Sequence, residues 1–251
     1  MAVPTPIDRA DLDFDNGSFD SAAFAGKALA SWQALAGVID HTLLKPDATR
    51  AQVVALCNEA LRYQFACAMV NPVWASTAVG ALSGSGVSVG AVIGFPFGAS
   101  LVSTLRQEAT ALIRLGVREL DMVIPIGQLK SGNYPAVHHA IHAAASVAHH
   151  NGALLKLILE TSLLSMEEKL RGSEIAIQAG ADFIKTSTGF GESGATPADV
   201  ALIRGVAGGR CGIKASDGIR TVADVRAMLE AGANRIGTSA SVAIVRELGA
   251  E

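Results

Sequence analysis

Two lysines lie inside otherwise apolar segments, in ADFIKTS (181–187) and GIKAS (212–216). Lysine is almost never fully buried unless it is paired, so Lys185 and Lys214 need an explanation. A free lysine has a pKa near ~10.4, which leaves about one in 2,500 neutral at pH 7, and only the neutral amine is a nucleophile. Burial and a neighbouring cation both lower a lysine pKa. The pair therefore predicts an amine that attacks a carbonyl group.

The alternative is that these lysines are structural and pair with carboxylates. Two lysines on neighbouring strands, with Asp121 of LDMVIPI also directed inward, favour chemistry over a purely structural role. Lys156 in ALLKLILE is different, because it lies early in its strand with Glu160 on the same face. We predict that Lys156 is structural and pairs with Glu160.

Glycine-rich turns follow the last three apolar segments, as STGFGESGAT, ASDGIRT and GTSAS. Loops of this kind, next to a helix N-terminus such as the one that Thr221 would cap, often bind phosphate. The donors would be Gly218, Arg220, Gly237 and Ser239. The alternative is that the glycines only permit tight turns.

A metal-dependent mechanism would need histidine, and His138 and His142 have the i, i+4 spacing of a zinc pair. No glutamate lies between them, and their alanine-rich segment is predicted to be a helix outside the sheet. We therefore expect a solvated helical face and no metal site.

Eight apolar segments, separated by helical stretches, must position these side chains. Strands that alternate with helices indicate βαβ units, and a chain of 251 residues is close to the typical length of one (β/α)8 TIM barrel. A doubly wound sheet would call for G-x-G-x-x-G after the first strand, where this chain has DHTLLKPDAT. We predict an acidic N-terminal extension over 1–20, a barrel domain over 21–251, and a helix over 21–37 that closes the bottom of the barrel.

Composition excludes several other classes of protein. The net charge of −3 provides no basic field for nucleic acid. The first residues lack a signal-peptide pattern, and no apolar run is long enough to span a membrane. The three cysteines include no C-x-x-C pair. A reduced, cytoplasmic protein is the simplest expectation.

Five motifs, IDHTLLKPDAT, ELDMVIPIG, DFIKTSTGFG, GIKASDGIRT and RIGTSAS, occur in the order in which they occur in 2-deoxyribose-5-phosphate aldolases, and from about residue 36 to 246 the chain resembles that family. The resemblance implies a class I (Schiff-base) aldolase that cleaves 2-deoxy-D-ribose 5-phosphate to acetaldehyde and D-glyceraldehyde 3-phosphate, reversibly and without metal or organic cofactor. Lys185 would form the imine, Lys214 would perturb its pKa, and Asp121 would move protons through a bound water. A homo-oligomer, expected to be a dimer, is also implied. The residues implied to contact substrate are Asp40, Thr42, Asn71, Thr186, Thr188, Gly189, Gly218, Arg220, Gly237 and Ser239.

The chain departs from the family pattern at three positions. Met69 stands where the family often has cysteine, Asp217 where it usually has glycine, and Ala240 where it often has serine. Because the last two belong to the phosphate loops, an aldolase with a relaxed preference for phosphorylated substrate is one alternative. Others are a sugar-phosphate isomerase or synthase that uses lysine as a charge clamp, and a sugar-phosphate binding protein.

Overall fold

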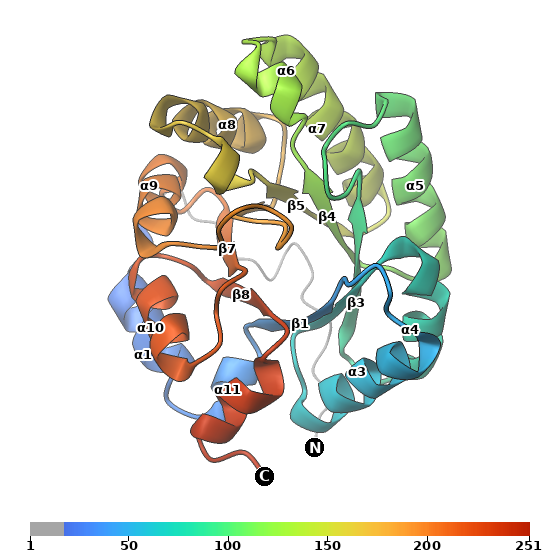
Figure 1. Ribbon diagram of the computed structural model, residues 1–251, viewed down its shortest axis with the longest axis vertical. Coiled ribbons are helices and arrows are strands. Elements are labelled where there is room, and N and C mark those ends of the chain that lie inside the picture. The colour runs from blue at the N-terminus through green and yellow to red at the C-terminus, as the bar shows by residue number, and fades with distance from the viewer. Residues whose placement is uncertain (1–17) are drawn as a thin grey trace.

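The computed structural model describes residues 18–251, and in this range eight parallel strands close into one barrel. Each strand is hydrogen-bonded to the next in sequence, and β8 pairs with β1 (Figure 1). The (β/α)8 prediction is confirmed. The strands are β1 (Ile39–Leu43), β2 (Cys67–Val70), β3 (Ser88–Ile93), β4 (Glu119–Val123), β5 (Leu154–Ile158), β6 (Phe183–Lys185), β7 (Gly212–Ser216) and β8 (Arg235–Thr238).

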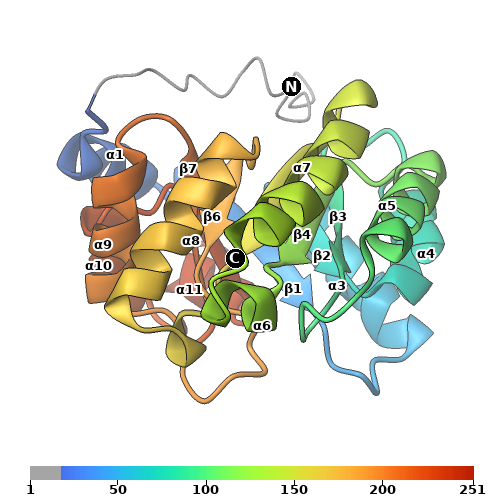
Figure 2. The same cartoon turned by 90° about the horizontal axis from the view of Figure 1, so that it is seen from above.

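Helices surround the strands on the outside of the barrel, as Figures 1 and 2 show. They are α1 (Ser21–Ala28), α2 (Trp32–Ala36), α3 (Arg50–Tyr63), α4 (Ala75–Leu82), α5 (Val102–Leu115), α6 (Ile126–Lys130), α7 (Tyr134–His150), α8 (Met166–Gln178), α9 (Pro197–Ala207), α10 (Val222–Glu230) and α11 (Ser241–Glu247). Two short 3-10 helices, η2 (Pro72–Trp74) and η3 (Thr161–Leu163), follow β2 and β5.

Local capping explains where several of these helices begin. Thr221 accepts a hydrogen bond from the Asp224 backbone N–H, while the Asp224 carboxylate accepts from the Thr221 N–H. Such a capping box satisfies donors that the first helical turn would leave unpaired. The prediction that Thr221 caps α10 is confirmed.

The two faces of the strands bury different kinds of side chain. Outward residues such as Ile39, Leu120 and Ile184 belong to the large apolar core between strands and helices. Inward, a small apolar cluster is formed by Leu44, Cys67, Met69 and Val92, with Phe95 packed against it, and the buried Phe183 ring lies against Gly212. The remaining inward positions of the strands are mostly glycine or charged. Most barrels of this class fill the interior with branched aliphatic residues, so a charged interior indicates function.

The segment predicted as one helix over 21–37 is two helices. Ser31 has an extended backbone, with φ −157° and ψ 160°, and its side chain caps α2. The break turns the chain so that α1 packs against α10 and α2 packs against α11. In both views α1 lies beside α10, so this half of the segment does not close the bottom of the barrel (Figures 1 and 2).

The predicted N-terminal extension falls largely outside the described residues. Phe19 and Asp20 are described, and both are engaged with the barrel domain. The Arg204 guanidinium lies over the Phe19 ring, 4.1 Å from its centroid, and Asp20 caps α1. Within residues 18–251, no helix combines the length and the apolarity needed to cross a membrane.

The charged groups of the interior lie next to closely packed apolar side chains. A substitution at Gly212 tests how much this packing contributes to stability. A Cβ at Gly212 would lie 2.2 Å from the Phe183 ring on the paired strand. We expect Gly212→Ala to lower the free energy of unfolding by about 1–3 kcal/mol, because the ring has to move in a packed interior. Urea denaturation measures this.

The matched control is Gly205→Ala on the exposed face of α9, where a Cβ would meet nothing within 4 Å. This substitution should stabilise the protein by about 0.5–1 kcal/mol, because alanine favours helix over glycine. A Gly212→Ala protein as stable as wild type would show that the Phe183 ring can move aside without cost.

Candidate active site

Strand pairing brings the two predicted lysines together at one carboxylate. Lys185, the last residue of β6, is paired in register with Lys214 on β7. The Lys185 Nζ lies 2.8 Å from Asp121 Oδ2, and the Lys214 Nζ lies 2.7 Å from the same oxygen. All three side chains are buried. Lys214 also forms an ion pair with Asp40.

Lys156 is not where the sequence placed it. It is the central residue of β5, it is fully buried, and its ammonium contacts three carboxylates. Its Nζ lies 2.5 Å from Glu119 Oε2, 3.0 Å from Asp121 Oδ1 and 3.2 Å from Asp40 Oδ2. The predicted pairing with Glu160 is wrong, because the inward direction of Lys156 takes its amine to Glu119 and Asp121 on the neighbouring β4 and to Asp40 on β1.

Arg235 and Glu119 complete the charged interior and were missed from the sequence. Arg235 donates its Nε–H to Asp40 Oδ1 at 2.5 Å and its Nη2 to both Glu119 oxygens at 2.9 and 3.0 Å. A signal was available, since Glu119 comes two residues before Asp121 and therefore shares its strand face. Arg235 likewise comes two residues before Gly237.

The pKa of Lys185 is lowered to about 8, first by burial. The Asp121 carboxylate opposes this change, and the positive charges of Lys214 and Lys156 add to it. At pH 7 roughly a tenth of an amine with this pKa is neutral, compared with about one in 2,500 for a free lysine. The site therefore makes Lys185 a usable nucleophile near neutral pH.

Burial acts in the opposite direction on Asp121, because it alone would raise the carboxyl pKa. The charges of Lys156, Lys185 and Lys214 outweigh burial and hold the pKa of Asp121 well below its usual value. Arg235, Lys156 and Lys214 do the same for Asp40. Both carboxylates are therefore ionised near neutral pH and can only accept protons or hydrogen bonds.

A cavity of about 320 Å³ opens at the C-terminal ends of the strands, with Lys185 in its wall. Residues predicted to contact substrate that line it are Thr42, Thr188, Gly189, Gly218, Arg220, Gly237 and Ser239. Lys45, in the turn after β1, also lines it and was not among the predicted residues. The cavity thus has an amine in one part of its wall and exposed cations, Lys45 and Arg220, in another.

Three residues predicted to contact substrate lie outside the cavity wall. Asp40 is fully buried among Lys156, Lys214 and Arg235. The Asn71 amide donates to the Leu44 carbonyl at 3.1 Å. Thr186 points away from the barrel interior. For these residues the geometry indicates positioning of other groups rather than contact with substrate.

The position of Thr186 along the chain decides whether its side chain faces the cavity or the outside of the barrel. Its hydroxyl donates to the Ser216 carbonyl at 3.2 Å and accepts from the Ser216 N–H at 3.1 Å. Because strand side chains alternate, the residue after the inward Lys185 must face outward. Thr186 therefore joins β6 to β7 and keeps the two lysines in register.

Glu160 organises the loop that follows β6. Its backbone is left-handed, with φ 57°, and its buried Oε2 accepts hydrogen bonds from the Thr188 hydroxyl and N–H. The Thr188 hydroxyl in turn accepts from the Phe190 N–H at 3.0 Å. This chain of bonds fixes the part of the cavity wall formed by Thr188, Gly189 and Phe190.

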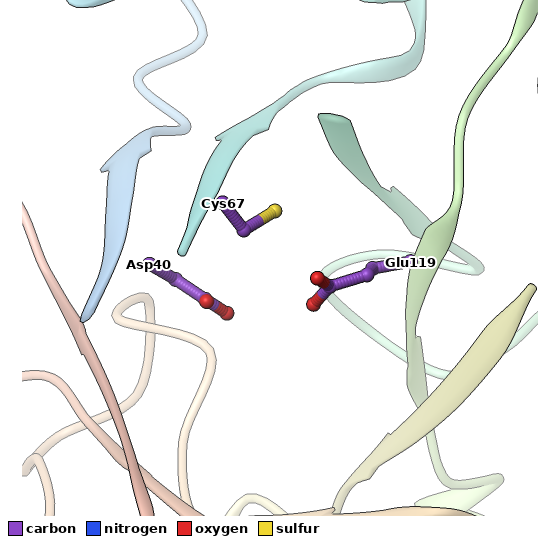
Figure 3. A group of neighbouring side chains, drawn as sticks. All are labelled: Asp40, Cys67 and Glu119. Atoms are coloured by element: carbon purple, nitrogen blue, oxygen red, sulfur yellow. The ribbon is translucent and has the colours of Figure 1, made fainter. Parts of the chain in front are cut away.

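One group of side chains has the composition of a metal site. Asp40, Cys67 and Glu119 offer ligand atoms that all lie within 4.8 Å of one another (Figure 3). However, Lys156 and Arg235 already contact both carboxylates, and burial raises the pKa of Cys67 well above its usual value. The protein's own cations occupy the positions that a divalent ion would need.

The histidines lie elsewhere. His138 and His142 stack on α7, with ring centroids 5.9 Å apart, on the outside of the barrel. His142 is exposed and His138 is partly buried.

A closed (β/α)8 barrel whose cavity opens at the C-terminal strand ends places the protein among the barrel enzymes.

Comparison with known proteins identifies the family. The model of the DeoC/LacD family of aldolases matches residues 35–246, and the chain belongs to this family. The chain is 51% identical over 211 residues to a deoxyribose-phosphate aldolase of Geobacillus sp. (strain WCH70), covering 84% of this chain and 94% of that protein. It is 48% identical to the one of Thermoanaerobacter sp. (strain X514), with coverage of 85% and 96%.

A solved structure agrees. The deoxyribose phosphate aldolase of Aeropyrum pernix, described as having a unique tetrameric structure, superposes with a TM-score of 0.84 at 34% identity. The match covers 91% of this chain and 96% of that one. The protein is therefore an aldolase, which is a lyase.

The charge of Lys214 should set the pH at which the site works. Removing it in Lys214→Leu takes away a repulsion that lowers the pKa of Lys185, so this pKa should rise by about one unit. Because the neutral amine is the reactive form, the acidic limb of the kcat/KM profile should move to higher pH by the same amount. Activity lost at pH 7 should return as the pH is raised.

The control is Lys130→Leu, which removes a partly exposed lysine on α6 that pairs with Glu168. It should leave the profile unchanged. A Lys214→Leu enzyme that is slower at every pH, with its acidic limb in place, would show that Lys214 contacts substrate instead.

Proposed function

We propose that this aldolase cleaves 2-deoxy-D-ribose 5-phosphate to acetaldehyde and D-glyceraldehyde 3-phosphate through an imine on Lys185, in a reversible reaction. The observation that carries the proposal is the Lys185 amine in the cavity wall, 2.8 Å from Asp121, with its pKa lowered to about 8. The relatives named deoxyribose-phosphate aldolase support the choice of substrate.

The first step makes the imine. The neutral amine of Lys185 adds to the substrate aldehyde, C1, and the carbinolamine loses water to give a protonated imine. Asp121 is the base beside this nitrogen and accepts a hydrogen bond from Lys214 as well. Its ionised carboxylate can take the proton that the amine gives up on addition and stabilise the cationic imine.

The second step breaks the C2–C3 bond. A base removes the proton of the C3 hydroxyl, C3 becomes the aldehyde carbon of glyceraldehyde 3-phosphate, and the bonding pair moves into the imine to form an enamine. Protonation of the enamine at C2 and hydrolysis then release acetaldehyde and the free amine. In this proposal Asp121 and Lys214 exchange the protons with Lys185 and the substrate through a bound water.

The loops after β6, β7 and β8 would hold the phosphate. Backbone N–H groups near Gly218 and Gly237, the Ser239 hydroxyl and the Arg220 guanidinium surround this part of the cavity. Lys45, which also lines the cavity, adds a second cation. A dianion in this position would be bound by charge and by backbone donors together.

Two further predictions accompany the proposal. A homo-oligomer, expected to be a dimer, stays a prediction, and the tetrameric description of the Aeropyrum pernix relative supports association of some kind. A cytoplasmic location also stays a prediction, supported by three cysteines that are all free and buried.

Reductive trapping tests the imine. Incubation with acetaldehyde and borohydride should convert Lys185 to its N-ethyl derivative, which peptide mass spectrometry locates. Lys185→Ala should show no adduct and lose at least a thousandfold of the activity, because covalent catalysis is lost. A sugar-phosphate isomerase or synthase would give no adduct, and an adduct on another lysine would overturn the role proposed for Lys185.

Asp217 makes a weaker preference for phosphate an alternative supported by geometry. It has φ 72°, the left-handed backbone that a glycine would adopt, as expected for a residue that tolerates this region. Its carboxylate oxygens lie toward Gly189 and Gly194, at the cavity wall. A carboxylate about 6 Å from a phosphate dianion would cost roughly 1–5 kcal/mol, for effective dielectric constants between 80 and 20.

We therefore expect Asp217→Gly to lower KM for deoxyribose 5-phosphate about tenfold, a change that corresponds to ~1.4 kcal/mol, and to leave KM for free deoxyribose nearly unchanged. Steady-state kinetics with both sugars measures this. Asp217→Asn is the matched control, because it keeps a similar shape without the charge and should have most of the effect. Equal KM values in all three proteins would mean that the carboxylate is directed to solvent.

A further inference from the structure

The barrel interior contains more basic groups than acidic ones. Four side chains that can be cationic, Lys156, Lys185, Lys214 and Arg235, share three carboxylates, Asp40, Glu119 and Asp121. All seven are buried. An unmatched charge in such a place is costly, so the lowest-energy state has one of the four basic groups neutral.

The ion-pair contacts differ between the four groups, and this difference decides which one is neutral. Lys156 contacts three carboxylates. Lys214 contacts two, and so does Arg235, whose guanidinium does not lose its proton in proteins. Lys185 contacts Asp121 alone. Of the four basic groups, Lys185 therefore loses the fewest ion-pair contacts when it is deprotonated.

We propose that Lys156 is a positioning residue of this aldolase: together with Arg235 it saturates Asp40 and Glu119, and so leaves Lys185 as the amine without a full carboxylate partner. Lys156 also holds Asp121 Oδ1 at 3.0 Å, which leaves Oδ2 directed at Lys185 and Lys214. Lys156 is not among the residues that line the cavity, so it acts through these carboxylates. The inference rests on the proposed function of Lys185.

Other charged groups near the site do not alter this balance. Glu160 is buried at the mouth of the barrel, but its carboxylate binds Thr188, and among residues 18–251 it forms no ion pair with the four basic groups. Cys67 faces the interior from β2 as a thiol, because burial raises its pKa. Asp217, Lys45 and Arg220 lie at the cavity wall, where solvent screens them.

The balance of buried charges predicts the direction in which the pKa of Lys185 should change in each variant. A simple loss of structure would not produce opposite directions. Lys156→Met removes a cation, so Lys185 can keep its proton more easily and its pKa should rise. Glu119→Gln removes a carboxylate, so the pKa of Lys185 should fall further. The double variant loses one of each and should return close to the wild-type value, as coupled neighbours in one network do.

The measurement is the acidic limb of the kcat/KM profile, which reports the pKa of the free enzyme. We expect the limb to move up by about one pH unit or more in Lys156→Met and down in Glu119→Gln, with most of either shift cancelled in the double variant. Lys156→Arg keeps the charge and should keep the limb in place. At pH 7 the rise in Lys156→Met corresponds to about a tenfold loss of neutral amine, which should be recovered at higher pH.

Lys169→Met is the matched control. Lys169 forms a 2.6 Å ion pair with Asp199 between α8 and α9, outside the barrel interior, and is also largely buried. Its loss should affect stability and leave the acidic limb unchanged. Circular dichroism melts of all variants separate unfolding from a change in titration.

If the Lys156 variants do not fold, the wild-type enzyme still gives an answer. In ¹⁵N-lysine NMR, the Lys185 amine, identified as the signal that N-ethylation by acetaldehyde and borohydride shifts, should titrate near pH 8. A second buried lysine, Lys156, should stay protonated to the highest pH at which the protein is folded. Two lysines that titrate together would overturn the inference.

The two proposals fail in different ways. An adduct found on a lysine other than Lys185 in the wild type overturns the proposed function. An adduct on Lys185 in every variant, with the limb moving in the same direction or not at all in Lys156→Met and Glu119→Gln, overturns the positioning role of Lys156 and leaves the proposed function intact.

Discussion

The carboxylate of Asp121 is the contact on which the site depends, because three lysines from three strands meet at its two oxygens. A buried carboxylate with no partner would be protonated, and a buried lysine with no partner would be neutral. Sharing one carboxylate among three amines keeps the acid ionised and leaves the amines in competition for it. Lys156 also contacts Asp40 and Glu119, which hold its pKa high, whereas Lys185 contacts Asp121 alone and its pKa is lowered by burial.

Such an interior is costly, and the rest of the fold supports it. A buried ion pair often contributes little net stability, since desolvation offsets the attraction between the charges. The stability of this protein must therefore come from the continuous apolar layer between the strands and the surrounding helices. Cross-strand bonds such as those of Thr186 with Ser216 then keep neighbouring strands in register, so that the charges meet at hydrogen-bonding distance.

The site also divides into a rigid interior and a wall made by loops. The amines and carboxylates belong to strands, whose positions are fixed by closure of the barrel. The cavity wall belongs to the loops after β1, β6, β7 and β8, where Lys45, Asp217 and Arg220 lie. The reaction at Lys185 therefore depends on strand residues, whereas binding of the substrate phosphate would depend on loop residues. A substitution at Asp217 can change phosphate binding without changing the reaction at the amine.

The sequence by itself determined the fold class, because eight apolar segments alternating with helical ones leave few arrangements other than a closed parallel barrel. It also identified Lys185, Lys214 and Asp121 as inward, since alternation along a strand is local. It could not show which charges meet across the barrel: the contacts of Lys156 with Asp40 and Glu119 join residues that are far apart in sequence. The outward direction of Thr186 follows from the same local alternation, whereas those contacts depend on register and packing. Only the tertiary structure decided them, because the distance between two side chains on different strands is set by closure of the whole sheet and not by any one segment.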